Sequence, residues 1–114
     1  GVVVLVYPVI SMCENYHIGS HDLLIGKKAT PEMEKFTSIE QNVDADYPRT
    51  YIWCGSRDTC VPPENSIAMD KVLSANNVDH IFRLFPDAGH GIGLAKETSA
   101  ENWSVEALKF WLNV

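Results

Sequence analysis

The chain has 114 residues, of which 46% are hydrophobic and 21% charged, which is typical of one globular domain and not of a disordered segment. Its net charge of −6 argues against nucleic acid or an anionic membrane surface as a partner, because both need basic patches. No apolar run reaches the about 20 residues of a membrane-spanning helix, and three cysteines make no disulfide framework, so we expect reduced thiols and a cytoplasmic location.

Residues 2–7 form a continuous apolar run that ends at Pro8. Continuous hydrophobicity is typical of a strand buried on both faces, as in a parallel sheet. Because the chain opens directly on this strand, we expect further strands to precede it in a larger parent sheet. The edge they would cover carries no Lys, Pro or bulge signal, so we expect a homodimer through this strand or association with a missing N-terminal half.

Residues 11–47 are more polar and too long for a simple connecting loop. Short helices are predicted near 20–24 and 31–36, the second with proline in its first turn. We interpret this segment as a lid-like insert, because inserts of this length often cover or line a binding site.

The insert contains a loose polar cluster of Glu14, His17, His21 and Asp22. His17 and His21 are four residues apart, as in half of a zinc-binding helix, but the H-E-x-x-H core is absent. A solvated start of a helix is the better interpretation. The sequence therefore predicts no metal site and no cofactor.

The remainder alternates strands and helices. Strands are predicted at 50–54 and 80–85, the second near a sheet edge, and helices at 64–76 and 100–112. We expect the first helix to place Ile67, Ala68, Val72 and Ala75 on its inner face. We expect the second to place there Trp103, Ala107, Phe110 and Trp111. This order predicts the α/β class, with three parallel strands joined by right-handed crossovers.

Two residues stand where catalytic groups occur in parallel sheets, just beyond the ends of strands. Asp58 follows the strand at 50–54, and His90, between two glycines, follows the strand at 80–85. Each alone is more simply a loop residue. Together, in this order, they match the acid and base of a serine hydrolase, in which a buried carboxylate orients the imidazole. We expect their side chains to lie within about 2.6–3.2 Å.

The nucleophile that such a pair serves is not found in these residues, since no G-x-S-x-G motif occurs. Ser56 follows Gly55, but Asp58 stands where the second glycine should be. The two cysteines that flank Asp58, Cys54 and Cys60, fit neither C-x-x-C nor a metal spacing. Cys60 is most simply a loop cysteine, with a reactive thiol as the alternative.

Several segments resemble the C-terminal portion of α/β-hydrolase esterases, in the acetyl-xylan-esterase-like group of sugar-ester hydrolases related to the hormone-sensitive-lipase type. The most specific are the D-x-x-V-P-x-E-N-S segment at 58–66 and the G-H-G-x-G-L-A segment at 89–95. Others are Pro8-Val9-Ile10-Ser11, Gly19-Ser20, Leu24-Ile25-Gly26, Ser38 to Val43 and Trp53. The resemblance implies that Asp58 is the triad acid, that His90 is the triad base, and that the substrate is a small ester.

Residues 1–114 are therefore interpreted as a single partial α/β-hydrolase domain. The resemblance also implies an oxyanion-hole H-G-G segment and a serine elbow upstream, and neither occurs in this sequence. We expect a fragment of a serine carboxylic-ester hydrolase that is inactive by itself. The alternative is a small α/β binding or interaction module without catalysis.

Overall fold

Three parallel strands, β1 (Val2–Val6), β2 (Arg49–Gly55) and β3 (His80–Phe85), form one sheet in the order β1-β2-β3. The computed structural model describes residues 1–114. β2 is the central strand and is buried along all but its first residue, because a neighbour lies on each side. The predicted strands, their parallel pairing and the place of β3 at an edge are confirmed.

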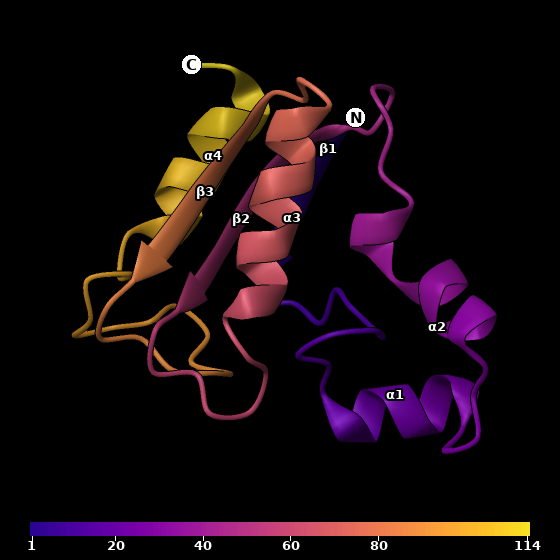
Figure 1. The fold of residues 1–114 in the computed structure, drawn as a ribbon. Helices are drawn as coiled ribbons and strands as arrows, with labels where there is room; N and C mark the ends of the chain where they lie inside the picture. The colour runs from indigo at the N-terminus through magenta and orange to yellow at the C-terminus, as the bar shows by residue number, and fades with distance from the viewer.

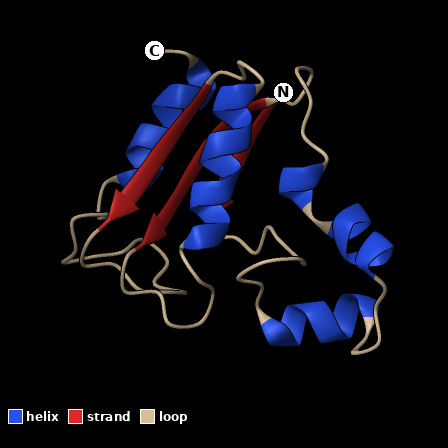
Figure 2. Ribbon diagram, in the orientation of Figure 1, coloured by secondary structure: helices blue, strands red, loops and turns tan.

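Two helices cover opposite faces of this sheet, as Figures 1 and 2 show: α3 (Glu64–Ala75) lies in front of it and α4 (Trp103–Leu112) behind. The strand alternation decides which core each β2 residue joins, since successive side chains point to opposite faces. Tyr51 and Trp53 pack with Ala107 and Phe110 on the α4 side. On the other face Ile52 packs in a second buried cluster with α3, completed by Ile10, Met69, Leu73 and Val78.

The inner face of α3 differs from the predicted one. The buried residues are Asn65, Ser66, Met69 and Leu73, whereas Ala75 is exposed and Ile67, Ala68 and Val72 are only half-buried. The prediction followed apolar residues alone. Two of the four inward positions, Asn65 and Ser66, are polar. Asn65 faces inward because it hydrogen-bonds to the loops at the helix start. With this side of the helix turned inward, Met69 and Leu73 lie in the core.

α4 also departs from the prediction. It begins at Trp103, not at residue 100, because a preceding turn is closed by the Trp103 N–H donating to the Ala100 carbonyl. Trp103 packs beside Trp53, with 5.6 Å between ring centroids, but Trp111 is 64% exposed and is not a core anchor. Trp111 follows the buried Phe110 directly, and one residue turns a helix by about 100°, away from the sheet.

The insert contains the two predicted helices, α1 (Ile18–Ile25) and α2 (Pro31–Thr37), followed by a short 3-10 helix, η1 (Ile39–Gln41), that packs against α3. In Figure 1, α1 and α2 lie beside the layers formed by the sheet, α3 and α4. Side chains cap both helices: His17 accepts from the Ser20 N–H, and Thr30 accepts from the Met33 N–H.

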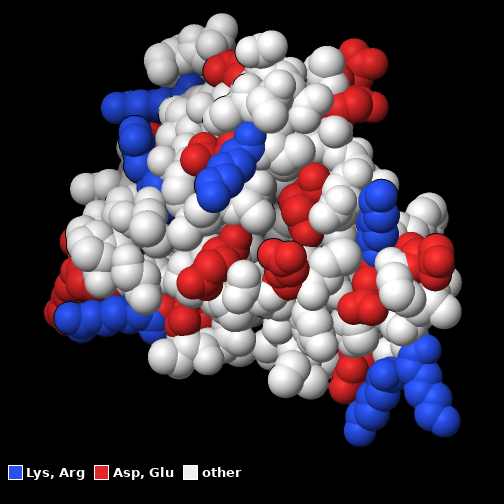
Figure 3. All heavy atoms as spheres, in the orientation of Figure 1, with Lys and Arg blue, Asp and Glu red and all other residues white.

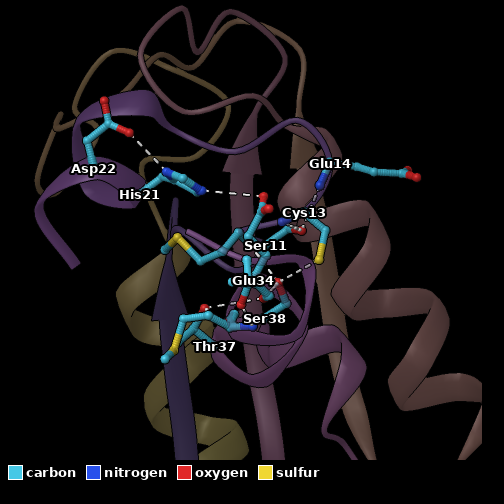
Figure 4. A network of polar contacts seen from close by, with 11 residues as sticks. Ser11, Cys13, Glu14, His21, Asp22, Glu34, Thr37 and Ser38 are labelled. Atoms are coloured by element: carbon cyan, nitrogen blue, oxygen red, sulfur yellow. Dashed lines mark hydrogen bonds and ion pairs between the residues drawn. The ribbon is translucent and has the colours of Figure 1, made fainter. Parts of the chain in front are cut away.

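His21 joins the two insert helices, as the sticks in Figure 4 show. Its Nδ1 lies 2.9 Å from the Asp22 carboxylate on α1, and its Nε2 lies 3.4 Å from the Glu34 carboxylate on α2. Tyr16 stacks on the ring at 4.4 Å, and only 5% of His21 remains exposed. The solvated helix start expected for this cluster is therefore wrong for His21, which is a buried link between helices.

Acidic side chains predominate in the middle of the face shown in Figure 3. This agrees with the formal net charge of −6. None of the helices combines the length and the hydrophobicity needed to span a bilayer.

The outer edge of β1 is unpaired, because β1 has a neighbour only on the β2 side. All five of its residues are half-buried, although they form a continuous apolar run. Exposed strand edges of this kind pair with other chains. We expect the 114-residue polypeptide to self-associate through β1, so that its apparent mass in light scattering rises with concentration. A monomer at every concentration tested would contradict this expectation.

Glu106 joins α4 to the sheet. Its carboxylate accepts hydrogen bonds from the Tyr51 hydroxyl and from Arg83 Nη2, each at 2.8 Å. The Arg83 hydrogen bond lowers the pKa of Glu106, and burial raises the pKa of Tyr51 well above its usual range. Because Arg83 and Glu106 are both partly exposed, the ion pair contributes at most about 1 kcal/mol.

This pair should make stability fall in acid. A carboxyl whose pKa is lowered by folding stabilises fully above its unfolded pKa, and the contribution is lost as the pH falls through the lower folded pKa. Glu106→Gln should therefore reduce the free energy of unfolding near neutral pH and make little difference in acid, as measured by urea titration. The exposed Glu101, with no ion pair, is the control; an equal effect of Glu101→Gln would contradict the assignment.

Candidate active site

The loops that follow β2 and β3 are bonded to each other at the carboxyl edge of the sheet. The Ser56 N–H donates to the Phe85 carbonyl at 2.9 Å, and the Arg57 N–H donates to the Ala88 carbonyl at 3.0 Å. These bonds continue the contact between the strands beyond their ends. Residues 32 positions apart, Asp58 and His90, are thereby brought onto adjacent loops.

Gly55, the last residue of β2, makes this approach possible. A Cβ atom at position 55 would lie 1.9 Å from the Ala88 carbonyl oxygen, far inside van der Waals contact. Only glycine lets the two backbones lie so close. The position of the His90 loop relative to the Asp58 loop therefore depends on residue 55 being a glycine.

Asp58 is held rigidly, and only 1% of its side chain is exposed. Oδ1 accepts from the N–H groups of Cys60, at 2.9 Å, and Val61, at 2.8 Å. Oδ2 accepts from His90 Nδ1 at 2.7 Å. A buried carboxylate needs such partners, because an unpaired charge away from water is unfavourable. The two backbone bonds leave one oxygen for the histidine.

His90, unlike Asp58, is partly open to solvent, with 32% of its side chain exposed. An ionised Asp58 carboxylate only accepts hydrogen bonds, so Nδ1 donates the proton, and in the neutral imidazole Nε2 then carries the lone pair. The chain after His90 turns through Gly91 and Gly93 with φ of 68° and 59°, values that favour glycine. The predicted distance between Asp58 and His90 is confirmed.

Two residues near this site were not assigned a role from the sequence. Asn65 is 1% exposed, and its Oδ1 accepts from the N–H groups of Ile10 and Ser11 at 3.0 and 2.9 Å. Its Nδ2 donates to the carbonyls of Asn15 and Pro62, at 2.8 and 3.1 Å. Asn65 thereby ties the start of the insert to the loop of Asp58. The available signal was an asparagine in the first turn of the predicted helix, directly after the loop of Asp58.

Tyr7 is the second such residue. It follows β1 directly, and its ring centroid lies 4.7 Å from that of His90. It also contacts Trp53 edge-on, with 5.2 Å between centroids. The sequence signal is slight: an aromatic residue between a strand and a proline.

The other predicted side chains are placed apart from this pair. Cys54 is buried, which raises the pKa of its thiol, whereas Cys60 is exposed with Sγ 3.7 Å from His17 Nε2. No group of three or more His, Cys, Asp or Glu side chains is placed to hold a metal ion. None of the surface hollows is lined by Asp58 or His90.

A family model for the prolyl oligopeptidase family of S9 peptidases matches residues 2–114. The chain belongs to this family. The curated endo-1,4-β-xylanase B of Butyrivibrio fibrisolvens is 31% identical over 102 residues, which make up 90% of this chain and 16% of that protein. The chain therefore spans only a small part of that relative's length.

Solved structures give the same fold. An acetyl ester-xyloside bifunctional hydrolase from Caldicellulosiruptor lactoaceticus is 34% identical with a TM-score of 0.93, over 98% of this chain and 42% of that one. A sugar hydrolase from Lactococcus lactis is 27% identical with a TM-score of 0.80, over 98% of this chain and 47% of that one. The predicted fold class, part of an α/β-hydrolase with three parallel strands and covering helices, is confirmed, and so is the resemblance to esterases.

Gly55→Ala should separate the two loops, because the added methyl group meets the Ala88 carbonyl. We expect a loss of about 3 kcal/mol in the free energy of unfolding, typical of severe overpacking. Gly89→Ala is a matched control beside His90, since its Cβ would meet nothing closer than the Arg57 oxygen at 3.9 Å. Urea unfolding of both variants tests this; equal stabilities would contradict the role of Gly55.

Proposed function

We propose that residues 1–114 supply the acid, Asp58, and the base, His90, of a serine carboxylic-ester hydrolase. The observation that carries the proposal is the 2.7 Å hydrogen bond from His90 Nδ1 to the buried Asp58 carboxylate, made between the loops that follow β2 and β3. This bond leaves Nε2 free on a partly exposed ring. Of the other His–carboxylate contacts, His80 with Asp70 lies at the start of β3, away from this edge, and His21 with Asp22 and Glu34 lies between the insert helices.

In the proposed reaction His90 Nε2 takes the proton of a serine hydroxyl as its oxygen attacks the ester carbonyl carbon. Asp58 keeps the proton on Nδ1 and stabilises the imidazolium that forms. The Nε2 proton then passes to the leaving alcohol as the ester bond breaks, and an acyl-serine remains. Nε2 then takes a proton from a water molecule as the water oxygen attacks the acyl carbon. The bond to the serine oxygen breaks, the carboxylic acid is released, and His90 returns the proton from Nε2 to the serine.

The serine itself is proposed to come from outside residues 1–114. None of the serines here stands in a G-x-S-x-G motif. This chain covers 42% and 47% of the two solved relatives, so more than half of each relative lies outside the matched part. The association partner of these residues is then the segment that bears the nucleophile, and the unpaired edge of β1 is the proposed place of contact.

The proposed substrate is a small-molecule ester of a sugar. Support comes from two solved relatives, one described as an acetyl ester-xyloside hydrolase and the other as a sugar hydrolase. The acidic surface fits a small neutral substrate better than nucleic acid or an anionic membrane. Three free cysteines support the proposal of a cytoplasmic location, where thiols stay reduced.

Residues 11–47 are proposed to act as a lid-like insert beside the site. The support is their attachment: Asn65 joins Ser11 and Asn15 to Pro62, four residues after Asp58. Cys60, in the same loop, contacts His17 at the start of α1. A movement of the insert would therefore reach the loop that carries the triad acid.

The experiment compares hydrolysis of p-nitrophenyl acetate by two polypeptides. The 114-residue chain should give only background hydrolysis, because nucleophile and oxyanion hole are both lacking. The complete protein encoded by the gene should turn over the ester, and His90→Ala should reduce kcat by about 10³-fold or more. His80→Ala, which removes the histidine of a His–carboxylate pair at the opposite edge of the sheet, should leave kcat unchanged.

Full activity of the complete His90→Ala protein would contradict the proposal. It would favour the alternative that residues 1–114 are a module without a catalytic role. Saturable turnover by the 114-residue chain that His90→Ala abolishes would also contradict it. The nucleophile would then lie within these residues, and the exposed Cys60 thiol would be tested first.

A further inference from the structure

The hydrogen bond to Asp58 restrains only one atom of the His90 ring. It fixes Nδ1 at 2.7 Å from the carboxylate and leaves the ring free to rock about that bond. A general base must direct its other nitrogen toward the proton it takes, within hydrogen-bond reach. Since 32% of the His90 side chain is exposed, few neighbours are available to hold it.

Tyr7 is a neighbour that holds the ring itself. Its centroid lies 4.7 Å from that of the imidazole, with the planes inclined at 59°, within the range of attractive aromatic contacts. Tyr7 reaches His90 from the end of β1, whereas Asp58 reaches it from the loop after β2. The imidazole is thus restrained from two strands.

The Tyr7 ring is fixed in turn by the core. The backbone N–H of Tyr7 donates to the Trp53 carbonyl at 2.8 Å, and Tyr7 is the residue after Val6, the last residue of β1 that pairs with β2. Its ring meets the Trp53 indole edge-on, at 5.2 Å and 87°, and Trp53 is fully buried. A chain of contacts therefore runs from the rigid core through Tyr7 to His90.

The backbone of Tyr7 is strained. Its φ is 39°, in the left-handed region that a bulky side chain avoids. Pro8 follows, and a residue before proline prefers extended conformations, so the strain has a second source. Of the other non-glycine residues with positive φ, three are Asn, which tolerates this region, and the rest are Ala95 and Glu97. Strain of this kind gathers at functional sites and persists only where surrounding structure enforces it.

We propose that Tyr7 is a positioning residue, whose ring sets the orientation of the His90 imidazole for proton transfer. The inference rests on the proposed function of His90. Glycine at position 7 would relieve the backbone, so what the strained conformation supplies is the aromatic ring beside the base. The ring, not the hydroxyl, makes the contacts with both Trp53 and His90.

The test uses three variants of the complete protein, assayed with p-nitrophenyl acetate. Tyr7→Phe keeps the ring and should keep kcat within about twofold of the parent. Tyr7→Leu and Tyr7→Gly remove it and should lower kcat about tenfold or more, because a misdirected base slows proton transfer. KM should stay unchanged, since Tyr7 is proposed to contact the base and not the substrate. Tyr7→Gly also relieves the strained φ, which keeps the test available if the leucine variant does not fold.

A spectroscopic measurement separates positioning from simple packing. The Nδ1–H proton of His90 should give a sharp NMR signal in the parent and in Tyr7→Phe, and a broadened one in Tyr7→Leu and Tyr7→Gly. Phe110→Leu is the packing control: Phe110 is buried in the same cluster, but beside Arg49 at the start of β2. It should lower stability and leave both kcat and the signal unchanged.

The outcomes distinguish this inference from the proposed function. If His90→Ala abolishes hydrolysis while Tyr7→Leu keeps the parental kcat and a sharp signal, the positioning role is refuted and the triad stands. A tenfold loss in Tyr7→Phe would also refute it, since the hydroxyl would then matter. If His90→Ala has no effect, the proposed function itself fails, whatever the Tyr7 variants do.

Discussion

The contact between Gly55 and the Ala88 carbonyl is the constraint on which the candidate site depends. Because no Cβ intervenes, the loops after β2 and β3 bond to each other directly, Arg57 to Ala88 and Ser56 to Phe85. Asp58 lies one residue beyond Arg57, and His90 lies two residues beyond Ala88. A hydrogen bond between side chains is sensitive to displacements well below 1 Å, so the backbone contact has to be this close for the pair to form.

The rest of the structure supports this edge from both faces of the sheet. On the α4 face, Trp53 carries Tyr7, and Tyr7 meets His90. At the start of α3, Asn65 satisfies all of its hydrogen-bonding groups by joining the first residues of the insert to the loop of Asp58. The proposed acid, Asp58, is thus fixed through backbone N–H groups, and the proposed base, His90, through an aromatic contact. These two modes suit the proposed roles, in which Asp58 stays in place and His90 exchanges protons.

The sequence predicted those features whose signal is local. Apolar runs located the first two strands and alternating hydrophobicity the third, at residues 80–85. Asp58 and His90 could be paired because parallel strands bring their carboxyl ends to one edge. Features that depend on a distant partner were missed. The inward turn of Asn65 depends on loops 50 and more residues away. The contact of Tyr7 with His90 spans 83 positions and leaves no periodic trace.

The most direct test of the account asks whether Asp58 acts through His90. In the complete protein, kcat/KM for an ester is measured for Asp58→Asn, for His90→Ala and for the double variant. Groups that work as one unit give strongly non-additive losses, so the double variant should be no slower than His90→Ala alone. Losses that multiply would show that the two residues act independently, and the hydrogen bond between them would then not be the basis of catalysis.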